Sequence, residues 1–422
     1  MQRLRLCAPI KSGCRPFRGD KPHSHWCPPF IKDWLFGVVG VFGGVVGMAL
    51  AQAQVKNVTP MNETLFFGGP SELGSEGALG SLQISGAFSG LVAQENTTAL
   101  NTAQNSTERS NAFLIVQKNT GTLQYLLQAG HYTLHTLGAK TDGASGIEKN
   151  SFGPIPHAYV SLNPNEHWSL AVGKLLAMPG FENPFTYQNQ NIQRGVLENQ
   201  NNTITQGIQL NYTDERSTLF WTLNDGFYSG QLKWMGAGGS YKFNARHSTN
   251  VMLGGAYQTS KVNTDVTPRL QNNSQIFNLV HTLKMGPWTL TPYYQYTKIP
   301  SSENTGLASA ASTQGYALII NHQGPAPSMS FMPRPGTLNL PLRLEHIKAS
   351  DYRSVNAQEL VFGPGSEALA VTFTPTLQSG VYYARGEWSW LKAKHTSMLR
   401  ESRPGAYANS QSRILLELGI LY

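Results

Sequence analysis

The chain has 422 residues, of which 13% are charged, 40% are hydrophobic and 42 are glycine. A soluble domain usually carries about 25% charged residues. The composition therefore excludes a charge-rich disordered protein, and it is too polar for a bundle of membrane helices. The uncharged polar and aromatic residues that remain favour many β-strands.

The N-terminal part contains the three regions of a secretory signal peptide. Basic residues prevail in residues 1–34, the uncharged run Leu35–Leu50 follows, and Ala51-Gln52-Ala53 supplies a small-residue cleavage site. We expect residues 1–53 to be a signal peptide removed during export. The alternative is an N-terminal membrane anchor, but the apolar run is short for a span of about 20 residues.

Removal of this segment would change the redox chemistry and the charge of the chain. Cys7, Cys14 and Cys27 all lie in it, so the mature chain would lack cysteine and would need a large core or a closed sheet for stability. The segment also holds seven basic and two acidic residues, which leaves about +3 of the formal +8. The high isoelectric point is thus a property of the leader, and nucleic acid is not an expected partner.

From residue 81 onward the chain alternates apolar and polar residues in units of about 8–12 residues, bounded by Asn, Gly, Asp, Pro and Ser. We predict about sixteen β-strands on this pattern: 81–94, 110–118, 123–138, 154–162, 168–175, 204–213, 217–224, 231–243, 248–260, 274–284, 288–298, 311–321, 337–348, 367–375, 380–392 and 411–422. The glycines of 231–243 interrupt the alternation and predict a bulge. Pro292 and Pro341 argue against the boundaries of their strands, since proline cannot donate to a ladder.

The connections between these strands alternate in length. Most links after odd-numbered strands are long and polar, namely 95–109, 139–153, 176–203, 261–273, 299–310, 349–366 and 393–410. Links after even-numbered strands are short, such as Asn163–His167 and Thr376–Ser379, and 322–336 is the exception. Long loops on one rim and tight turns on the other are typical of an outer-membrane barrel.

We therefore predict an all-β fold, a transmembrane antiparallel up-and-down β-barrel over residues 81–422, with long extracellular loops and short periplasmic turns. Residues 54–80 would form an N-terminal periplasmic segment. Closure pairs every backbone group inside the bilayer, and the low charge follows because lipid-facing charges cost about 2–4 kcal/mol at mid-membrane.

Aromatic residues near strand ends fit girdles at the two membrane interfaces: Trp168, Trp288, Trp388, Trp390 and Tyr422. The last strand also carries alternate apolar residues up to its end: Leu416, Leu418, Ile420 and Tyr422. This pattern is typical of the C-terminal signal by which the barrel assembly machinery recognises its substrates. The assembly machinery and periplasmic chaperones are therefore expected partners.

Several stretches resemble the beta-barrel porin-2 (OmpL-like) family over most of 80–422. They are HAYVSL at 157–162, VGKLLAMPGFE at 172–182, the Arg-x-Glu features Arg343-Leu344-Glu345-His346 and Arg385-Gly386-Glu387-Trp388, and the segment 368–390. The resemblance implies an outer-membrane pore for small hydrophilic solutes, surrounded by outer-membrane lipid and lipopolysaccharide.

Three strands place charges of opposite sign on one face: Arg343 with Glu345, Arg385 with Glu387, and Arg413 with Glu417. One interpretation is a lattice of charges in the lumen that sets ion preference. The other is mutual neutralisation that keeps the barrel wall rigid. The two interpretations are compatible, and we predict all six residues to line the pore.

The longest predicted loop, 176–203, is a candidate constriction, because porins, which the chain resembles, can fold a loop after an early strand inward. In that arrangement Lys174, Glu182 and Arg194 would line the pore. The alternative is a loop exposed to solvent on the surface.

Enzymatic motifs are missing from the sequence, which contains no G-x-S-x-G, no H-E-x-x-H and no P-loop. His131 and His135 could share a metal on a helix, but the segment is predicted as a strand that holds them about 13 Å apart. We expect no cofactor. An outer-membrane hydrolase with Ser and His brought together across strands, a sealed structural barrel and a soluble secreted β-protein remain the alternatives.

The most concrete prediction is a porin that passes small hydrophilic solutes by diffusion. A mature charge near +3 predicts at most a weak preference for anions. Porins often form trimers, so a homotrimer is an open expectation for which the sequence indicates no interface.

Overall fold

The computed structural model describes residues 65, 71–73, 82–97, 102–139, 151–177, 180–264, 266–327, 335–350, 365–394 and 410–422. The predicted signal peptide lies outside these residues, and so does most of 54–80. Among the residues described, no helix is long and apolar enough to cross a membrane.

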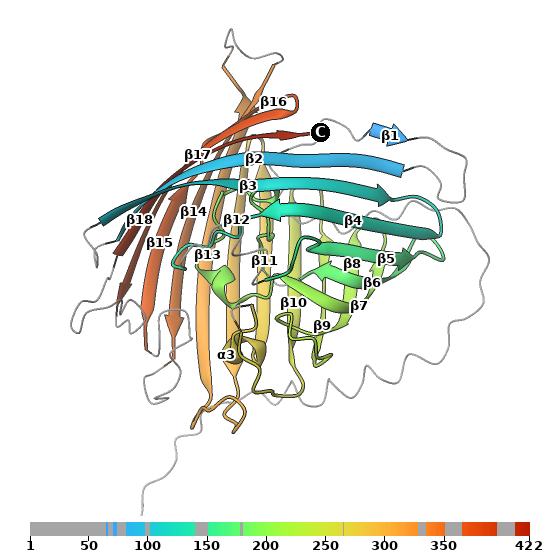
Figure 1. The fold of residues 1–422 in the computed structure, drawn as a ribbon, viewed down its shortest axis with the longest axis vertical. Helices are drawn as coiled ribbons and strands as arrows, with labels where there is room; N and C mark the ends of the chain where they lie inside the picture. The colour runs from blue at the N-terminus through green and yellow to red at the C-terminus, as the bar shows by residue number, and fades with distance from the viewer. Residues whose placement is uncertain are drawn as a thin grey trace, which may run out of the picture. The chain divides into compact units, whose positions relative to one another are not determined.

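Strands account for nearly all of the regular structure (Figure 1). They are β1 (Ser71–Leu73), β2 (Leu82–Thr97), β3 (Thr102–Lys118), β4 (Leu123–Tyr132), β5 (His157–Leu162), β6 (Trp168–Leu176), β7 (Ile204–Thr213), β8 (Ser217–Asn224), β9 (Trp234–Lys242), β10 (His247–Ala256), β11 (Gln275–Met285), β12 (Trp288–Ile299), β13 (Ala311–Pro325), β14 (Thr337–Ala349), β15 (Glu367–Phe373), β16 (Thr376–Ser379), β17 (Tyr382–Lys394) and β18 (Ser410–Leu421). The short helices are η2 (Thr186–Gln188), η3 (Leu197–Gln200) and α3 (Arg269–Asn272).

The strands close into a ring. Neighbours in sequence pair antiparallel from β2 to β14, β15 and β16 together fill one position between β14 and β17, and β18 pairs with β2. The result is the predicted closed antiparallel barrel of sixteen strands. Closure leaves no free sheet edge, which is the condition for a sheet to cross a bilayer.

The seam between β18 and β2 joins the two ends of the barrel. Leu421 lies opposite Ala87, and Gly86 and Tyr422 exchange two backbone hydrogen bonds of 2.8 and 3.1 Å. Beyond Tyr422, β1 continues the pairing along Leu82–Ile84 of β2. The Tyr422 ring stacks on Phe88 at 6.1 Å, so β18 ends in an aromatic contact with its partner strand.

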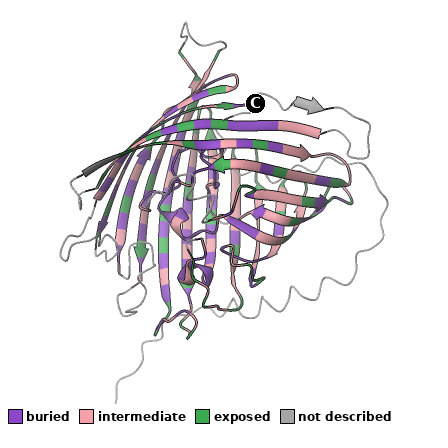
Figure 2. Cartoon of the chain, viewed as in Figure 1, coloured by how far each residue is buried: buried purple, intermediate pink, exposed green. Residues whose placement is uncertain are grey.

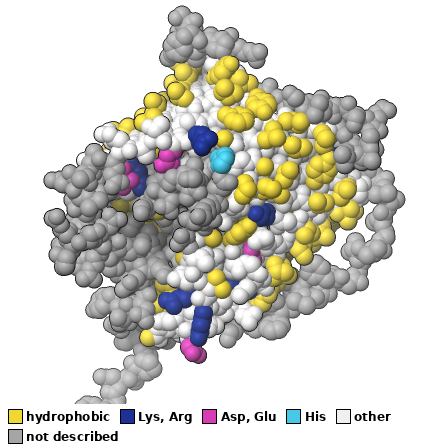
Figure 3. Space-filling model, viewed as in Figure 1, with side chains coloured by type: hydrophobic (Ala, Val, Ile, Leu, Met, Phe, Trp, Pro, Cys, Tyr) yellow, Lys and Arg dark blue, Asp and Glu magenta, His cyan; other side chains and the backbone are white. Residues whose placement is uncertain are grey.

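Burial alternates along the strands as the sequence pattern predicts (Figure 2). On β18, Leu416 and Leu418 are exposed, whereas Arg413, Leu415 and Glu417 are buried. The outward face is the apolar one, and Figure 3 shows hydrophobic side chains gathered over the strands of one side of the barrel with few charges among them. The buried charged residues of the strands therefore face the inside.

Several sequence predictions about the strands are wrong. The expected long link 95–109 is mostly strand, since β2 and β3 extend to within a few residues of each other. The expected turn Thr376–Ser379 is strand β16, and the chain turns at Gly380 instead. The expected strand 123–138 ends at Tyr132. The expected bulge in 231–243 is absent, because β9 keeps one register with β8 and β10.

An unpredicted bulge lies between β2 and β3. The register shifts between Ser89 and Gly90, which leaves Ser110 as the extra residue of β3. Both Ser110 and its neighbour Asn111 are consequently buried on the inner side.

The proline-containing strands are kept. Pro341 lies within β14 and faces Asn321 of β13, while on its other side the partner strand is broken between β15 and β16. The Pro341 carbonyl accepts a hydrogen bond from Thr374 N at 3.0 Å within this break. The missing proline N–H is thus matched by an interruption of the neighbouring strand.

Candidate functional site: a charged wall beneath an inner segment

Residues 180–203, here called the inner segment, lie inside the ring. A second stretch, residues 133–139 after β4, lies against it: Leu137 N donates to Arg194 O, and Arg194 N donates to His135 O, both at 2.9 Å. These bonds form a short parallel bridge between Thr136 and Arg194. The predicted constriction loop therefore folds inward. Residues 133–138, which were predicted as the end of a strand, lie inside the barrel beside it.

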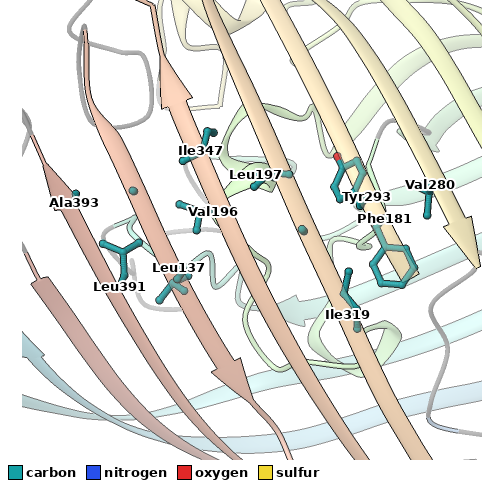
Figure 4. Packing of buried hydrophobic residues seen from close by; sticks show 13 residues of the cluster. Leu137, Phe181, Val196, Leu197, Val280, Tyr293, Ile319, Ile347, Leu391 and Ala393 are labelled. Carbon is teal, nitrogen blue, oxygen red and sulfur yellow. The ribbon is translucent and has the colours of Figure 1, made fainter. Parts of the chain in front are cut away.

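Apolar side chains hold the inner segment against the barrel wall (Figure 4). Val196 and Leu197 of the segment pack in one buried cluster with Ile319 of β13, Ile347 of β14 and Leu391 of β17. A Cβ on Gly315 of β13 would stand 2.7 Å from Leu197 Cγ, so this glycine makes room for the leucine.

On β14, Arg343 and Glu345 both bind the inner segment. Arg343 pairs with Glu182 of the segment, and its Nη1 also donates to Gln193 O at 2.9 Å. Its Nε donates to Glu345 at 3.0 Å. Glu345 in turn accepts a hydrogen bond from Leu197 N at 3.3 Å. Both side chains are buried, at 2% and 5% relative exposure.

On β17, Glu387 is held by the backbone of the segment. It accepts hydrogen bonds from Ile192 N at 2.5 Å, from Gln193 Nε2 at 2.9 Å and from Thr374 Oγ1 at 2.7 Å. Arg385, two residues earlier, donates to Asn189 O at 2.9 Å and pairs with a neighbouring carboxylate on β18.

That carboxylate is Glu417, which several hydroxyl groups surround. It accepts hydrogen bonds from Thr186 Oγ1 and Ser110 Oγ at 2.7 Å and from Ser89 Oγ at 2.9 Å. The bulge in β3 has a clear role here, because it turns Ser110 toward the carboxylate.

The third arginine, Arg413 of β18, connects both inner stretches to the wall. It donates to Gln193 Oε1 at 2.7 Å, to Ala139 O at 2.6 Å and to Thr136 O at 3.2 Å. Its Nε pairs with Glu95 of β2 at 2.9 Å.

The six wall residues thus act together as a docking surface. Guanidinium groups donate to backbone carbonyls of the inner stretches, and carboxylates accept backbone N–H groups, so both polarities of an irregular backbone are satisfied. Each Arg-x-Glu pair bonds to the segment, and each residue is almost completely buried. Breaking one buried pair would leave an uncompensated charge, which typically costs about 3–5 kcal/mol.

Burial also shifts the titration of the inner segment. It raises the pKa of Glu198 to about 7, and the nearby Glu182 carboxylate adds to this shift. Burial likewise raises the pKa of Glu182, with Arg343 acting in the opposite direction. Burial lowers the pKa of His135 to about 4, assisted by the positive charge of Arg413. At neutral pH His135 is therefore uncharged, whereas Glu198 titrates.

Lys174 lies apart from this cluster, so its predicted place at the constriction is corrected. On β6 it alternates with the buried Ser169 and Ala171 and shares the face of Val172. Its ammonium donates to Phe152 O and Ile155 O, both at 3.0 Å, and stands 5.3 Å from the ring of Tyr228. The other eight predicted charges, Glu182, Arg194, Arg343, Glu345, Arg385, Glu387, Arg413 and Glu417, do meet.

Sequence reasoning missed the uncharged partners that complete the docking. Asn189, Asn191 and Gln193 supply donors and acceptors to the wall, and Gln200 bonds to Thr297 at 2.7 Å. The signal was the density of Asn and Gln in residues 188–202, because amides can satisfy both donors and acceptors. The part that His135 and Glu95 play in this docking was not predicted, because the strand ends expected next to both residues were wrong.

Comparison with known proteins identifies a matching family. The family model described as "Putative beta-barrel porin-2, OmpL-like" matches residues 81–422. No curated protein sequence matches the chain.

Three solved structures match the chain at low sequence identity. An anion-selective porin from Comamonas acidovorans matches with a TM-score of 0.53 and 14% identity, covering 81% of this chain and 99% of that one. OmpT, an outer membrane protein of Vibrio cholerae, has a TM-score of 0.49 at 9% identity, covering 83% and 100%. OpdL of Pseudomonas aeruginosa has 0.42 at 11% identity, covering 81% and 98%. At these identities the first match shows a common fold, and the other two scores support no further argument.

Proposed function

The chain belongs to the "Putative beta-barrel porin-2, OmpL-like" family, and we propose that its inner segment narrows a water-filled pore for small hydrophilic solutes. The protein is an outer-membrane porin, a closed barrel of sixteen strands. A barrel of this size leaves an aqueous channel, and a segment docked on one wall reduces its width.

The observation that carries this proposal is the docking of the inner segment on charged residues of β14, β17 and β18. Glu387 binds Ile192 N, and Arg343 binds Gln193 O. A segment held at both its donors and its acceptors has a defined position, which a constriction needs. Ion preference would then depend on the few charges of this cluster, including Glu182 and Arg194, because the sum over the whole chain does not act at one point.

A hydrolase is the second candidate, and one contact on the outer wall bears on it. Thr249 Oγ1 and His281 Nδ1 lie 2.8 Å apart, and His281 Nε2 lies 3.3 Å from His247 Nδ1. A nucleophile and base of this kind need a third group that orients the base. Here the third group is the imidazole of His247 and not a carboxylate that would orient a charged base. We therefore favour a channel without catalysis.

The remaining proposals concern the chain's route and its partners. Residues 1–53 would be cleaved off as a signal peptide during export. The barrel assembly machinery would then recognise the outward residues of the last strand, namely Leu416, Leu418, Ile420 and Tyr422. Periplasmic chaperones would hold the chain before assembly. A homotrimer would be the functional assembly.

Reconstitution of the mature chain in planar bilayers tests the channel. We expect stable unitary conductance steps, and a larger step for the double variant Arg343→Met/Glu387→Gln, whose segment has lost two anchors. The matched control is Lys174→Gln, which changes a cation outside the cluster and should conduct like the wild type. A wild-type barrel that folds but gives no steps would exclude the pore, and an unchanged step in the double variant would exclude the constriction.

A further inference from the structure

The outward face of the barrel has a group of four exposed lysines near one rim. This lysine patch consists of Lys298 on β12, Lys348 on β14, and Lys392 and Lys394 on β17. All four lie at strand ends that lead into the long loops, which places them at the extracellular side of the membrane.

The register brings the lysine patch together across neighbouring strands. Lys348 lies opposite Glu367 of β15, and Glu367 lies opposite Lys394. Two strand spacings separate Lys348 from Lys394, which is about 10 Å. Glu367 also binds His346 at 2.9 Å, so the one carboxylate between these two lysines is already hydrogen-bonded.

Directly below the patch, the same strands become apolar. The outward residue after Lys348 is His346, which lies level with Leu369 of β15 and Lys392 of β17. The next outward row is Leu344 on β14, Val371 on β15 and Trp390 on β17. Tyr316 of β13 lies opposite His346 and contacts Tyr294 of β12, with ring centroids 5.1 Å apart. An aromatic row with lysines just beyond it marks the boundary between acyl chains and headgroups.

The described residues at the opposite ends of these strands carry no outward lysine. Leu338 begins the outward row of β14, and Tyr382 begins that of β17. General membrane attraction would place basic residues at both boundaries. Among the described residues of β12–β17, outward lysines lie only at the boundary that leads into the long loops, where the outer leaflet of an outer membrane presents phosphorylated glycolipid.

We propose that the lysine patch binds the phosphate groups of lipopolysaccharide in the outer leaflet. Lysine is a common phosphate ligand, and its ammonium can replace divalent cations between the phosphates. Two lysines about 10 Å apart, Lys348 and Lys394, suit a headgroup with two phosphates better than one with a single phosphate. The site rests on the outer-membrane placement, not on the pore, so it can fail without affecting the channel.

The test measures binding of purified diphosphoryl lipid A to the full mature protein, folded in detergent free of lipopolysaccharide. We expect the triple variant Lys348→Gln/Lys392→Gln/Lys394→Gln to bind at least tenfold more weakly. The control variant Lys118→Gln/Lys242→Gln/Lys284→Gln removes three lysines at the other rim and should bind like the wild type. Heat-modifiable gel mobility confirms that each variant is folded.

Two further arms identify the ligand chemistry. Monophosphoryl lipid A should bind the wild type more weakly than the diphosphoryl form, and phosphatidylglycerol should not compete at equal concentration. Equal binding by wild type and triple variant would overturn the proposal. Equal competition by phosphatidylglycerol would also overturn it, because the patch would then be a general anionic-lipid surface.

Discussion

Glu387 is bound by backbone amides of the inner segment, whereas Glu417 on the neighbouring strand is bound by a guanidinium and three hydroxyl groups. The hydroxyl groups on Glu417 are those of Ser89, Ser110 and Thr186, with Tyr383 Oη at 3.5 Å as a fourth. The same residue type therefore serves two kinds of docking. Charge-assisted hydrogen bonds of this sort are stronger than neutral ones. Removing only one partner costs the most free energy, because the other is left buried and unpaired. Removal of Arg343 should destabilise the docking most, since Glu182 and Glu345 both pair with it.

Substitution of Arg343 by methionine should release the inner segment. Two buried carboxylates would remain without their cation, a loss of about 3–5 kcal/mol. Arg194, which is 9% exposed in the docked segment, would then become a trypsin site. We expect rapid cleavage after Arg194 in folded Arg343→Met protein and slow cleavage in the wild type.

Two further variants control this experiment. Arg343→Met/Glu182→Gln/Glu345→Gln removes the unpaired charges and should recover part of the protection. Lys174→Met removes a cation elsewhere and should be cleaved at the wild-type rate. Equal resistance of wild type and Arg343→Met would show that the apolar contacts of Val196 and Leu197 hold the segment alone.

At the scale of elements, the closing pair β2–β18 carries the most specific fit. Gly86 faces outward beside Tyr422, and a Cβ on this glycine would stand 2.5 Å from Tyr422 Cε1. Phe88, the next outward residue, stacks on the same ring. Because Gly86 has no side chain, the Tyr422 ring has room to lie over the seam between β2 and β18.

Gly86→Val should therefore weaken the closure of the barrel. Overpacking of this kind typically costs about 1–3 kcal/mol, and here the Phe88–Tyr422 stack would have to separate. Gly90→Val is the matched control, because it lies outward on the same strand and a Cβ added there would stand 3.9 Å from its nearest neighbour atom. We expect a lower urea midpoint of unfolding in lipid vesicles for Gly86→Val alone, and equal midpoints would contradict the fit.

The elements that sequence reasoning predicted well are those with a lipid-facing side. The bounds 204–213 and 217–224 are confirmed without change for β7 and β8, because alternation there is continuous and the turn is short. The predictions failed where residues serve the interior. The bulge at Ser110 and the inward path of 133–139 depend on partners far along the chain, such as Glu417 and Arg194, and no local pattern announces them.

The candidate site shows the same division. The Arg-x-Glu features and the inward loop could be predicted, since charge on one face of a membrane strand must point inward. What those charges do could not be predicted, because docking depends on which backbone groups reach them. Lys174 shows that a resemblance in motif does not fix the position of a side chain. Its motif resembles that of the family, but its position on β6 directs the side chain away from the cluster.

At the scale of the whole molecule, the net charge of the chain says little about the pore. The inner segment and the wall beneath it bring together four arginines, Arg194, Arg343, Arg385 and Arg413, and six glutamates, Glu95, Glu182, Glu198, Glu345, Glu387 and Glu417. Burial raises the pKa of Glu198 to about 7, so this carboxyl group loses its charge at low pH. The cluster therefore carries less negative charge in acid and becomes more negative as pH rises.

This balance predicts a selectivity that depends on pH. Glu198 is neutral well below its pKa of about 7 and anionic above it, so raising the pH adds a negative charge beside the pore. One charge acts on an ion 8 Å away in water by about 0.5 kcal/mol, which should raise the preference for cations about twofold. Reversal potentials in a KCl gradient at pH 5.5 and 8.5 measure the change. Glu198→Gln should remove most of it, and an equal rise in both proteins would assign the titration to other groups.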